Sequence, residues 1–388
     1  MIIAEPPRFE VYGAIKIFDV ARVLALSGGR RSRLTTAFTA ERGVLEDVAA
    51  RTAIIVPIKD EDMLTLENIL RAIPLDSLVI LVSASRRSPF DAFKSEVELA
   101  RLVASSLKRD ILVVYQFDEG WREALSGTQL ESMLGESGVR EGKGEGMILG
   151  VLAAAALGAD YVGFIDSDNY VPGAAWEYSM IYYTTFASRP RDRVMVRIVW
   201  PFKGKLASSD MYLRKRGRVS MHTNTVLNNA LSRVRRIETE IVKTANSGEH
   251  AMSMEIALTL DWAGGFAVEP YQMVWLFEKC YMQADEASCP FLPDYVYVYQ
   301  VEPRNPHIHA ERGDEHIASM IAVSLGTIYH SRLAVNGVRE TIEKVLREYN
   351  LNPPPPKPRI YTLRGVDPKS VIERFLSESR DSVYFQYS

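Results

Sequence analysis

Short apolar runs recur along the chain from residue 52 onward. The first, Ala53–Val56, ends at Pro57, and comparable runs cover Leu78–Val82, Ile111–Tyr115 and Tyr161–Ile165. Four or five consecutive apolar residues between polar segments are typical of strands that are buried on both faces. The pattern therefore predicts four buried strands in this part of the chain.

Segments with apolar residues at helical spacing separate these runs. They are Glu61–Ala72, Phe93–Leu107 and Gly146–Leu157. Strands that alternate with helices indicate an α/β fold with a mainly parallel sheet. Beyond residue 190, the β-rich segments Val194–Trp200 and Tyr295–Val301 predict two further strands among helices.

The two ends of the chain differ from this regular pattern. Near the N-terminus we expect an extended piece around Val11–Phe18 and a loop at Gly28–Ser32. Near the C-terminus, Pro353–Pro356 predicts an exposed rigid connector to a last helix near Lys369–Leu376. We therefore expect three regions: a leader segment (1–50), a nucleotide-sugar-binding catalytic domain (51–260) and a C-terminal region that completes the site (261–388).

Composition limits the classes of protein that the chain can belong to. Its 388 residues are 47% hydrophobic, which is ample for a buried core, and the net charge of −3 argues against general nucleic-acid binding. No signal peptide and no run of about 18 apolar residues occurs, so we expect a cytoplasmic protein without a membrane span. Cys280 and Cys289 are the two cysteines, which we expect to be free thiols, with one bridge closing a short loop as the alternative.

Asp166-Ser167-Asp168 directly follows the fourth predicted strand. Ligands of parallel sheets bind outside the carboxyl ends of the strands, so this segment and Pro57–Glu61, after the first strand, are where we expect chemistry. Two carboxylates one residue apart can turn towards one divalent cation, and oxygen ligands suit Mg²⁺ or Mn²⁺. The alternative is that these polar residues only form a turn and a helix cap.

Two other segments offer groups that bind metals or phosphates. The pair His307-x-His309 points both rings to one face of an extended segment, and imidazole ligands would favour Mn²⁺, Co²⁺ or Zn²⁺ over Mg²⁺. Lys143, in the glycine-rich stretch Gly142–Gly146, can reach a phosphate from a helix N-terminus. The alternatives are surface histidines and a flexible loop with a solvated lysine.

Two last segments are candidates for contacts with a substrate. Gly217, Arg218 and Ser220 combine a backbone N–H, a guanidinium and a hydroxyl, which suits a phosphomonoester or carboxylate; a basic β-turn is the alternative. Glu249 and His250 are expected at the start of a helix. There they would either cap the helix or make polar contacts with the substrate.

Taken together, five blocks of sequence resemble mannosyl-3-phosphoglycerate synthase. They extend from about residue 50 to residue 330, in one order: Val56–Glu61, Gly142–Met147, Tyr161–Ala174, Lys243–Met252 and Arg304–His309. The resemblance implies a glycosyltransferase A-type fold: a mainly parallel mixed sheet with flanking helices and a C-terminal α+β extension. It also implies metal-dependent transfer of mannose from GDP-mannose to the 2-hydroxyl of 3-phosphoglycerate, with retention, in the synthesis of the compatible solute mannosylglycerate. A homodimer is expected for the family.

The resemblance also implies roles for individual residues. The donor would be bound by Pro57, Ile58, Lys59, Asp60, Glu61, Ser83, Lys143, Asp166 and Ser167. The divalent metal, Mg²⁺ or Mn²⁺ with Co²⁺ or Zn²⁺ as alternatives, would be bound by Asp168, His309 and Asp166. The acceptor would be bound by Gly217, Arg218 and Ser220, with Arg140 and His307, while Glu249 would touch the transferred sugar. Asp168, Glu249 and Lys143 are thus the expected catalytic residues, and Asp60 departs from the family pattern, which has Asn more often.

Other functions fit these motifs less well. Asp166-x-Asp168 is similar to the nucleophile motif of haloacid-dehalogenase phosphatases, but Tyr170 stands where that motif has Thr or Val. A nucleotidyltransferase would need a Gly-rich loop after the first strand, and a sugar-nucleotide binding protein would not need metal carboxylates together with an acceptor site. A glucosyl-3-phosphoglycerate synthase that uses another sugar nucleotide is the nearest alternative. No side chain is an obvious covalent nucleophile, which favours front-face substitution.

Overall fold

The structure is a computed structural model that describes residues 8–20, 41–200, 202–207, 210–215, 218–283, 285–309, 313–335 and 337–387. For residues 202–207, 210–215 and 218 only the backbone is described. Gly28–Ser32 and Gly217 therefore lie outside the described residues, and the side chain of Arg218 is not described.

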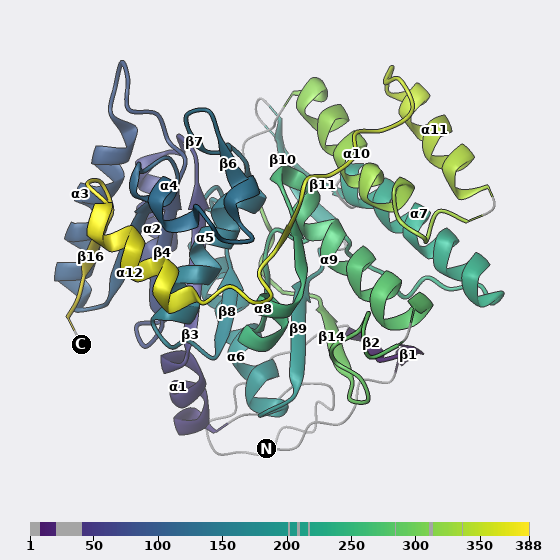
Figure 1. Ribbon diagram of the computed structural model, residues 1–388, viewed down its shortest axis with the longest axis horizontal. Helices are drawn as coiled ribbons and strands as arrows, with labels where there is room; N and C mark the ends of the chain where they lie inside the picture. The colour runs from purple at the N-terminus through teal and green to yellow at the C-terminus, as the bar shows by residue number, and fades with distance from the viewer. Residues whose placement is uncertain are drawn as a thin grey trace.

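The described chain alternates between strands and helices for most of its length (Figure 1). The strands are β1 (Arg8–Tyr12), β2 (Ile15–Val20), β3 (Thr52–Ile58), β4 (Leu78–Ser83), β5 (Ile111–Tyr115), β6 (Leu134–Gly135), β7 (Gly138–Val139), β8 (Tyr161–Phe164), β9 (Arg193–Ile198), β10 (Phe202–Ala207), β11 (Asp210–Lys215), β12 (His250–Ser253), β13 (Asp261–Ala263), β14 (Val296–Val301), β15 (Ile360–Thr362) and β16 (Val383–Phe385). The helices are α1 (Arg42–Ala50), α2 (Met63–Ala72), α3 (Ala92–Leu107), α4 (Gly120–Leu125), α5 (Lys143–Ala156), α6 (Pro172–Ser188), α7 (Arg218–Arg235), α8 (Met254–Thr259), α9 (Val268–Phe277), α10 (Asp314–Tyr329), α11 (Val338–Glu348) and α12 (Pro368–Glu378). Short 3₁₀ or π turns are η1 (Glu131–Met133), η2 (Gly265–Ala267) and η3 (Glu278–Gln283).

One large mixed sheet forms the centre of the molecule. Its ten described strands follow the order β1-β2-β14-β9-β12-β8-β3-β4-β5-β16. Seven of them run in one direction, while β1, β12 and β16 run antiparallel to their neighbours. The carboxyl ends of the seven parallel strands therefore meet at one edge of the sheet, and the amino end of β12 lies at the same edge.

The apolar runs fill a core on each face of the sheet. Along β3, Ala53 and Ile55 belong to one core, whereas Ile54 and Val56 belong to the other, because successive side chains of a strand point to opposite faces. Helices α1, α2, α3 and α6 cover the face of Ile54, and the remaining large helices cover the face of Ile55. Burial on both sides explains why the strands read as continuous apolar runs.

The predicted α/β fold with a mainly parallel mixed sheet is confirmed. All six predicted strands from Ala53 onward are present, and the predicted helices correspond to α2, α3, α5 and α12. The extended piece around Val11–Phe18 is a hairpin of β1 and β2 that pairs with β14, so the region 1–50 contributes strands to the central sheet. The sheet thus draws on all three regions expected from the sequence, and their division as domains stays a prediction.

The expectation of free cysteines is wrong. Cys280 and Cys289 form a disulfide, and both residues are buried. The turn η3 and the loop after it bring the two Cα atoms to 4.9 Å, within the distance that a disulfide spans. The alternative of one bridge closing a short loop is therefore the correct one.

The C-terminal segment crosses the molecule from α11 to α12, as the yellow part of the chain shows in Figure 1. Its proline run is less exposed than expected, because Pro355 is buried and its carbonyl oxygen lies 2.9 Å from Nε2 of His330. At the far end, Phe375 of α12 stacks on Trp121 with ring centroids 3.7 Å apart, and β16 pairs with β5. The segment thus carries the chain from α11 to the edge strand β16 of the central sheet.

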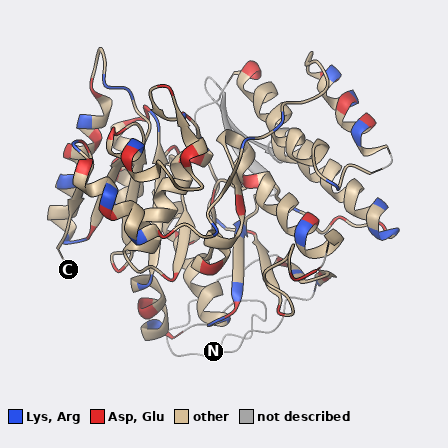
Figure 2. Ribbon diagram, in the orientation of Figure 1, with Lys and Arg blue, Asp and Glu red and all other residues tan. Residues whose placement is uncertain are grey.

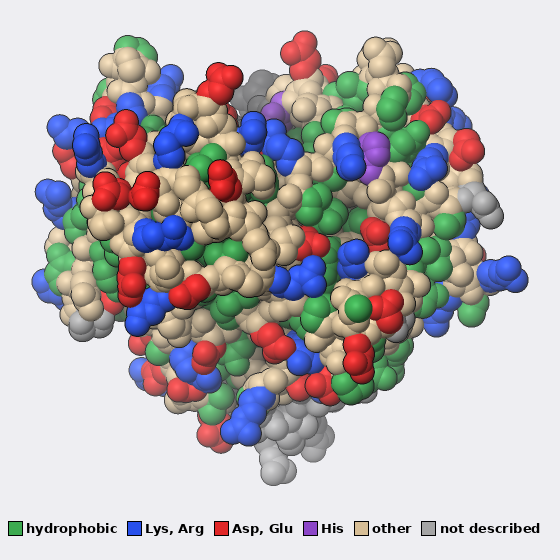
Figure 3. Space-filling view, viewed as in Figure 1, with side chains coloured by type: hydrophobic (Ala, Val, Ile, Leu, Met, Phe, Trp, Pro, Cys, Tyr) green, Lys and Arg blue, Asp and Glu red, His purple; other side chains and the backbone are tan. Residues whose placement is uncertain are grey.

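Charged side chains are spread over the whole molecule. Figure 2 shows basic and acidic residues on the helices at both sides of the sheet, and on the face in Figure 3 the two signs are interspersed. None of the described helices has the length and apolar character needed to cross a membrane.

Candidate active site

A cavity of about 780 Å³ opens at the edge where the parallel strands end. Segments that follow β3, β4, β5, β8, β9 and β14 line it, together with the segment before β12. The described lining residues are Pro57, Ile58, Lys59, Asp60, Glu61, Val82, Ala84, Gln116, Glu141, Gly142, Lys143, Gly146, Asp166, Ser167, Asp168, Trp200, Val219, Ser220, Asn246, Gly248, Glu249, Gly265, Phe266, Glu269, His307, His309, His316, Ile317 and Met320. Strand ends far apart in the sequence thus converge on one site, as the sheet topology requires.

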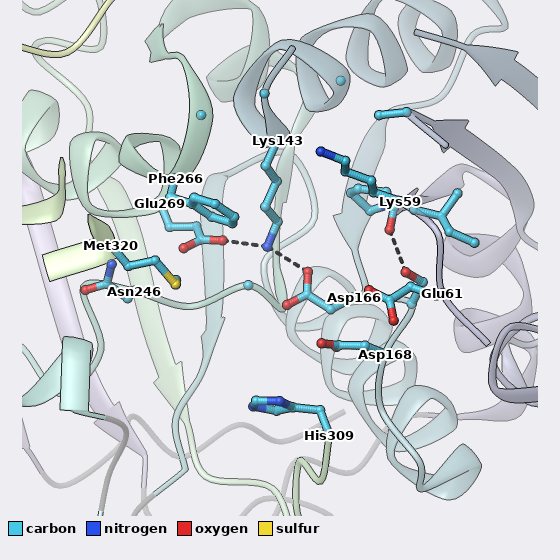
Figure 4. Close-up of a pocket in the computed structure, with 18 of the residues that line it drawn as sticks. Lys59, Glu61, Lys143, Asp166, Asp168, Asn246, Phe266, Glu269, His309 and Met320 are labelled. Atoms are coloured by element: carbon cyan, nitrogen blue, oxygen red, sulfur yellow. Dashed lines mark hydrogen bonds and ion pairs between the residues drawn. The ribbon is translucent and has the colours of Figure 1, made fainter. Parts of the chain in front are cut away.

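The acidic segment Asp166–Asp168 lies at the centre of this cavity. Figure 4 shows the carboxylate of Asp168 between Asp166 and the ring of His309. The hydroxyl of Ser167 donates to the carbonyl oxygen of Pro57 at 2.9 Å, which joins the ends of β8 and β3. The segment is therefore held by the neighbouring strand and presents its carboxylates to the cavity.

The histidine segment after β14 is bound directly to the acidic segment. The backbone N–H of Tyr170 donates to the carbonyl oxygen of Ile308 at 2.7 Å, and the N–H of Ile308 donates to Oδ1 of Asn169 at 3.3 Å. Next to it, the buried carboxylate of Glu177 on α6 accepts hydrogen bonds of 2.7 and 2.8 Å from the backbone of Asn305 and Arg304. These contacts fix where the two histidines lie relative to the aspartates.

The two histidines have different surroundings. The side chain of His307 is 4% exposed, with Nδ1 2.8 Å from Oε1 of Glu249 and Nε2 3.8 Å from Oδ1 of Asp168. His309 is half-buried, and its ring centroid lies 5.0 Å from that of His307. His307 therefore lies between Asp168 and Glu249, and the acceptor contact expected of it stays a prediction.

Glu249 lies before a strand, and the expectation of a helix start at this position is wrong. His250 begins β12, which is antiparallel to β8 and β9, so the residue before it lies at the cavity edge. His250 itself is buried under the cavity, where its ring stacks on Phe164, and burial holds its pKa well below the usual value. A Cβ at Gly248 would overlap the carboxylate of Asp166, so only glycine allows this close approach.

Lys143 begins α5, three residues earlier than the sequence predicts. Its Nζ lies 2.7 Å from Oδ1 of Asp166 and 2.7 Å from Oε1 of Glu269 (Figure 4). Burial alone would disfavour the ammonium, but the two carboxylates outweigh that cost and hold the pKa of Lys143 above its ordinary value. Lys143 is therefore a half-buried cation paired with two carboxylates and not the solvated lysine of the alternative.

All five residues of the expected donor segment Pro57–Glu61 line the cavity. Within it, Asp60 has a left-handed backbone (φ 55°), and its N–H donates to the hydroxyl of Ser85 at 2.7 Å. Lys59 forms an ion pair with Glu141 across the cavity rim. Ser83 is buried beneath the segment and does not line the cavity, so any effect of Ser83 on a ligand would pass through its neighbours.

The expected acceptor residues are brought together only in part. Ser220, in the first turn of α7, lines the cavity, and its hydroxyl donates to the carbonyl oxygen of Asn246 at 3.4 Å. Arg140 is exposed and does not line the cavity; its guanidinium is directed to the carbonyl oxygen of Ser132 at 3.4 Å. The basic run before Ser220 belongs partly to β11 and partly to α7, with residues 216 and 217 not described.

Sequence reasoning missed the residues that α9 and α10 contribute. Glu269, Phe266 and three residues of α10 (His316, Ile317 and Met320) line the cavity opposite Pro57–Glu61. Glu269 is the one charged residue in Val268–Phe277, and its side chain is only 4% exposed. A carboxylate in such an apolar segment could have identified this residue from the sequence, because a buried charge needs a partner.

The described lining of the cavity is strongly acidic. Seven carboxylates face two lysine ammonium groups: Asp60, Glu61, Glu141, Asp166, Asp168, Glu249 and Glu269 against Lys59 and Lys143. Such a lining would repel an anionic ligand such as a diphosphate unless a cation accompanies it. The charge of the site is therefore suited to a metal cation.

The residues expected to bind a metal fit that function as an incomplete set of ligands. Within the described ranges, no three His, Cys, Asp or Glu side chains are grouped closely enough to hold a metal ion by themselves. Asp166, Asp168 and His309 do line the same cavity from two adjoining segments. Two carboxylates and one imidazole suit a divalent cation that completes its ligands with phosphate oxygens.

Solved structures of glucosyl-3-phosphoglycerate synthase from Mycobacterium tuberculosis are similar to this chain. One, in complex with Mn²⁺, uridine-diphosphate and glucosyl-3-phosphoglycerate, is 19% identical and has a TM-score of 0.47, with 79% of this chain and 85% of that chain covered. Another, in complex with Mn²⁺ and uridine-diphosphate-glucose, is 21% identical and has a TM-score of 0.49, with 81% of this chain and 87% of that chain covered.

Sequence comparison extends over nearly the whole chain. Residues 5–375 match the family described as mannosyl-3-phosphoglycerate synthase. The protein of that name from Aeropyrum pernix is 59% identical over 386 residues, covering 99% of this chain and 100% of the relative. The one from Pyrococcus furiosus is 36% identical over 367 residues, covering 93% of each. The chain therefore belongs to the mannosyl-3-phosphoglycerate synthase family of glycosyltransferases.

Proposed function

We propose that this enzyme transfers mannose from GDP-mannose to the 2-hydroxyl of 3-phosphoglycerate, with retention and with a divalent metal. The observation that carries the proposal is the acidic cavity at the strand ends, in which Lys143 and the segment Asp166–Asp168 lie together. Family membership supports the sugar and the acceptor, since the relatives are named for the product mannosyl-3-phosphoglycerate.

The proposed metal site consists of Asp168, His309 and Asp166. A divalent cation bound there would neutralise the charge that develops on the departing diphosphate. Mg²⁺ or Mn²⁺ is the proposed ion, with Co²⁺ or Zn²⁺ as alternatives because of the imidazole ligand. Glu177 and Asn169 would keep the histidine segment in place whichever ion binds, since their side chains accept hydrogen bonds from its backbone.

The proposed donor site extends from Pro57–Glu61 to Lys143. Nucleoside and diphosphate would lie along the ends of β3 and β8, with the Lys143 ammonium near the phosphates. The acceptor would enter from the side of Ser220, where the first turn of α7 adjoins the cavity. Glu249 lies between the two and would contact the transferred sugar.

Retention of configuration requires either two displacements or attack on the face that the leaving group vacates. Glu249 is 1% exposed and its carboxylate lies 2.8 Å from His307, an arrangement that suits hydrogen bonding to a sugar more than nucleophilic attack. We infer front-face substitution, in which the leaving phosphate accepts the proton of the attacking hydroxyl. A mannosyl ester trapped on Glu249 or on an aspartate would contradict this step.

The test is an assay with pure protein, GDP-mannose and 3-phosphoglycerate. We expect release of GDP and one new phosphorylated α-mannoside, both suppressed by EDTA and restored by excess Mn²⁺ or Mg²⁺. Parallel reactions with UDP-glucose and GDP-glucose distinguish mannosyl transfer from the glucosyl alternative. Turnover that continues unchanged in EDTA would refute the metal site, and turnover with glucose donors alone would refute the donor.

The expected homodimer is also part of the proposal. Light scattering of the pure protein would give a mass twice that of the 43.6 kDa chain. A monomeric mass that persists at high concentration would contradict it.

A further inference from the structure

Lys143 is held by two carboxylates that belong to different parts of the fold. Asp166 follows β8, whereas Glu269 lies in the first turn of α9, and each has an oxygen 2.7 Å from Nζ of Lys143. The exposed fractions of the side chains are 15% for Lys143, 25% for Asp166 and 4% for Glu269. Glu269 is thus the more deeply buried of the two partners.

Hydrogen bonds from strand β9 of the central sheet fix the position of Glu269. Its backbone carbonyl accepts a hydrogen bond of 3.0 Å from the guanidinium of Arg197, a fully buried residue of β9. The same guanidinium donates at 2.8 Å to Oε1 of Gln272, one turn further along α9. The start of α9 is therefore anchored to the sheet, and the Glu269 carboxylate has little freedom to leave Lys143.

The two carboxylates differ in what else they can bind. Asp166 adjoins Asp168 at the centre of the cavity, where a cation and a diphosphate are proposed to bind. An Asp166 carboxylate that engages a cation gives up part of its attraction for Lys143. Glu269 is the partner that then remains, because it lies on the side of Lys143 away from Asp168 (Figure 4).

We propose that Glu269 is a positioning residue of the donor site, which holds the ammonium of Lys143 where the donor's diphosphate binds. The inference rests on the proposed function and adds to it a residue that acts through Lys143. Without the Glu269 charge, the lysine side chain would lose its fixed partner and would turn towards the remaining carboxylates. The binding affinity contributed by the phosphates of the ligand should decrease, whereas that contributed by the nucleoside should stay the same, because the ammonium binds phosphate as a point charge.

The test compares the affinities of GDP and guanosine, measured by calorimetry with Mg²⁺ present in both titrations. In the unchanged protein GDP should bind more tightly than guanosine. In Glu269→Gln we expect the affinity for GDP to fall about tenfold, the usual effect of losing one hydrogen bond to a charged group, while the affinity for guanosine stays the same. Glu278→Gln, which removes a half-buried carboxylate just beyond α9 and outside the cavity lining, is the matched control and should change neither affinity.

A double substitution separates positioning from a general structural effect. If Glu269 acts through Lys143, then Lys143→Ala with Glu269→Gln should bind GDP no more weakly than Lys143→Ala alone. Should Glu269→Gln fail to fold, Glu269→Asp keeps the charge, draws it back by one methylene, and should show a smaller loss for GDP alone.

Equal loss of affinity for GDP and guanosine, or no loss at all, would overturn the inference. A wild-type protein that does not distinguish GDP from guanosine would instead refute the proposed donor site, and the inference with it. The two failures are therefore distinguishable in one set of titrations.

Discussion

The two walls of the cavity are built in different ways. The first wall, residues 57–61, 82, 84, 116 and 141–142, follows β3, β4 and β5 and leads into α5. The second wall, residues 219–220, 246, 248–249, 265–266, 269, 307, 309, 316–317 and 320, is assembled from α7, α9, α10 and the segments around β12 and β14. Lys143 and Asp166–Asp168 lie between them, where both walls contribute partners (Figure 4).

Two lysine–glutamate pairs show what this difference means energetically. On the first wall Lys59 and Glu141 have side chains that are 56% and 60% exposed, whereas Lys143 and Glu269 are 15% and 4% exposed. An exposed pair contributes at most about 1 kcal/mol, but breaking a buried pair costs about 3–5 kcal/mol, since it leaves an uncompensated charge. Burial, and not residue type, decides which pair the site depends on.

The largest effect is expected where the two walls meet. Asp168→Ala should lower kcat about 10³-fold, because the variant loses a proposed ligand of the cation that stabilises the leaving diphosphate. The measurement is turnover with saturating donor and acceptor, with circular dichroism to verify that the fold is kept. Wild-type turnover in the variant would show that the chemistry lies elsewhere.

A buried carboxyl behind the first wall should make stability depend on pH. Glu96 on α3 is fully buried beside Ser83 and Ser85, and burial raises its pKa to about 7. The unfolded chain, with a pKa near 4.5, loses this proton first, so the folded state becomes less stable as pH rises from about 4.5 to about 7. Glu96→Gln should remove this loss, gaining up to about 3 kcal/mol relative to wild type between pH 4.5 and pH 8.

The check is denaturant unfolding of both proteins across that pH range. Glu98→Gln, on the exposed side of the same helix, should unfold as wild type does at every pH. A Glu96→Gln curve parallel to wild type would mean that the carboxyl is ionised in the folded protein.

A substitution behind the second wall, at a residue that does not line the cavity, should weaken metal binding. Glu177→Ala removes the acceptor of the hydrogen bonds from Arg304 and Asn305, which hold the histidine segment against α6. We expect the affinity for Mn²⁺ to fall about 10- to 100-fold, as is usual when the groups that orient metal ligands are removed. Calorimetric titration with Mn²⁺ in the presence of GDP measures this affinity.

A suitable control is Glu255→Ala, because this side chain is 54% exposed and pairs with Arg193. It should leave Mn²⁺ affinity unchanged. Equal effects of the two substitutions would contradict a specific role of Glu177.

The smallest effect is expected at the first wall's exposed pair. Glu141→Gln should change the free energy of unfolding by less than about 1 kcal/mol, since the partner Lys59 is half-exposed and screened by salt. Urea unfolding at low and high salt measures it. A larger change that salt does not affect would mean that the exposed pair contributes as much to stability as the Lys143–Glu269 pair, and would contradict the difference between the two walls.

The first wall could be predicted from the sequence because its residues follow strands that apolar runs predict. The apolar runs at Ala53–Val56 and Tyr161–Ile165 mark buried strands, and a parallel sheet brings their ends to one edge. Pro57–Glu61 and Asp166–Asp168 were therefore identifiable as cavity residues, and the structure brings them together. The order of the strands, with antiparallel β12 inserted between β8 and β9, has no such local signal.

The second wall depends on long-range packing, which local patterns do not encode. Glu249 reads as a helix start, yet β12 follows it, because pairing with β8 and β9 overrides the local preference. Glu269 and His316 come from helices whose apolar composition indicates burial but not the direction of each side chain. The Cys280–Cys289 bridge depends instead on a local feature, since the turn η3 and the short loop after it bring the two Cα atoms to 4.9 Å.

The central claim is that a divalent cation at Asp166–Asp168 accompanies the diphosphate of the donor. It is tested most directly by an anomalous difference map from crystals soaked with GDP and Mn²⁺. We predict a single strong peak within ligand distance of Asp168, His309 and the diphosphate, with Lys143 beside the phosphates. A nucleotide bound elsewhere, or one bound in this cavity with no ion near the acidic segment, would contradict the account.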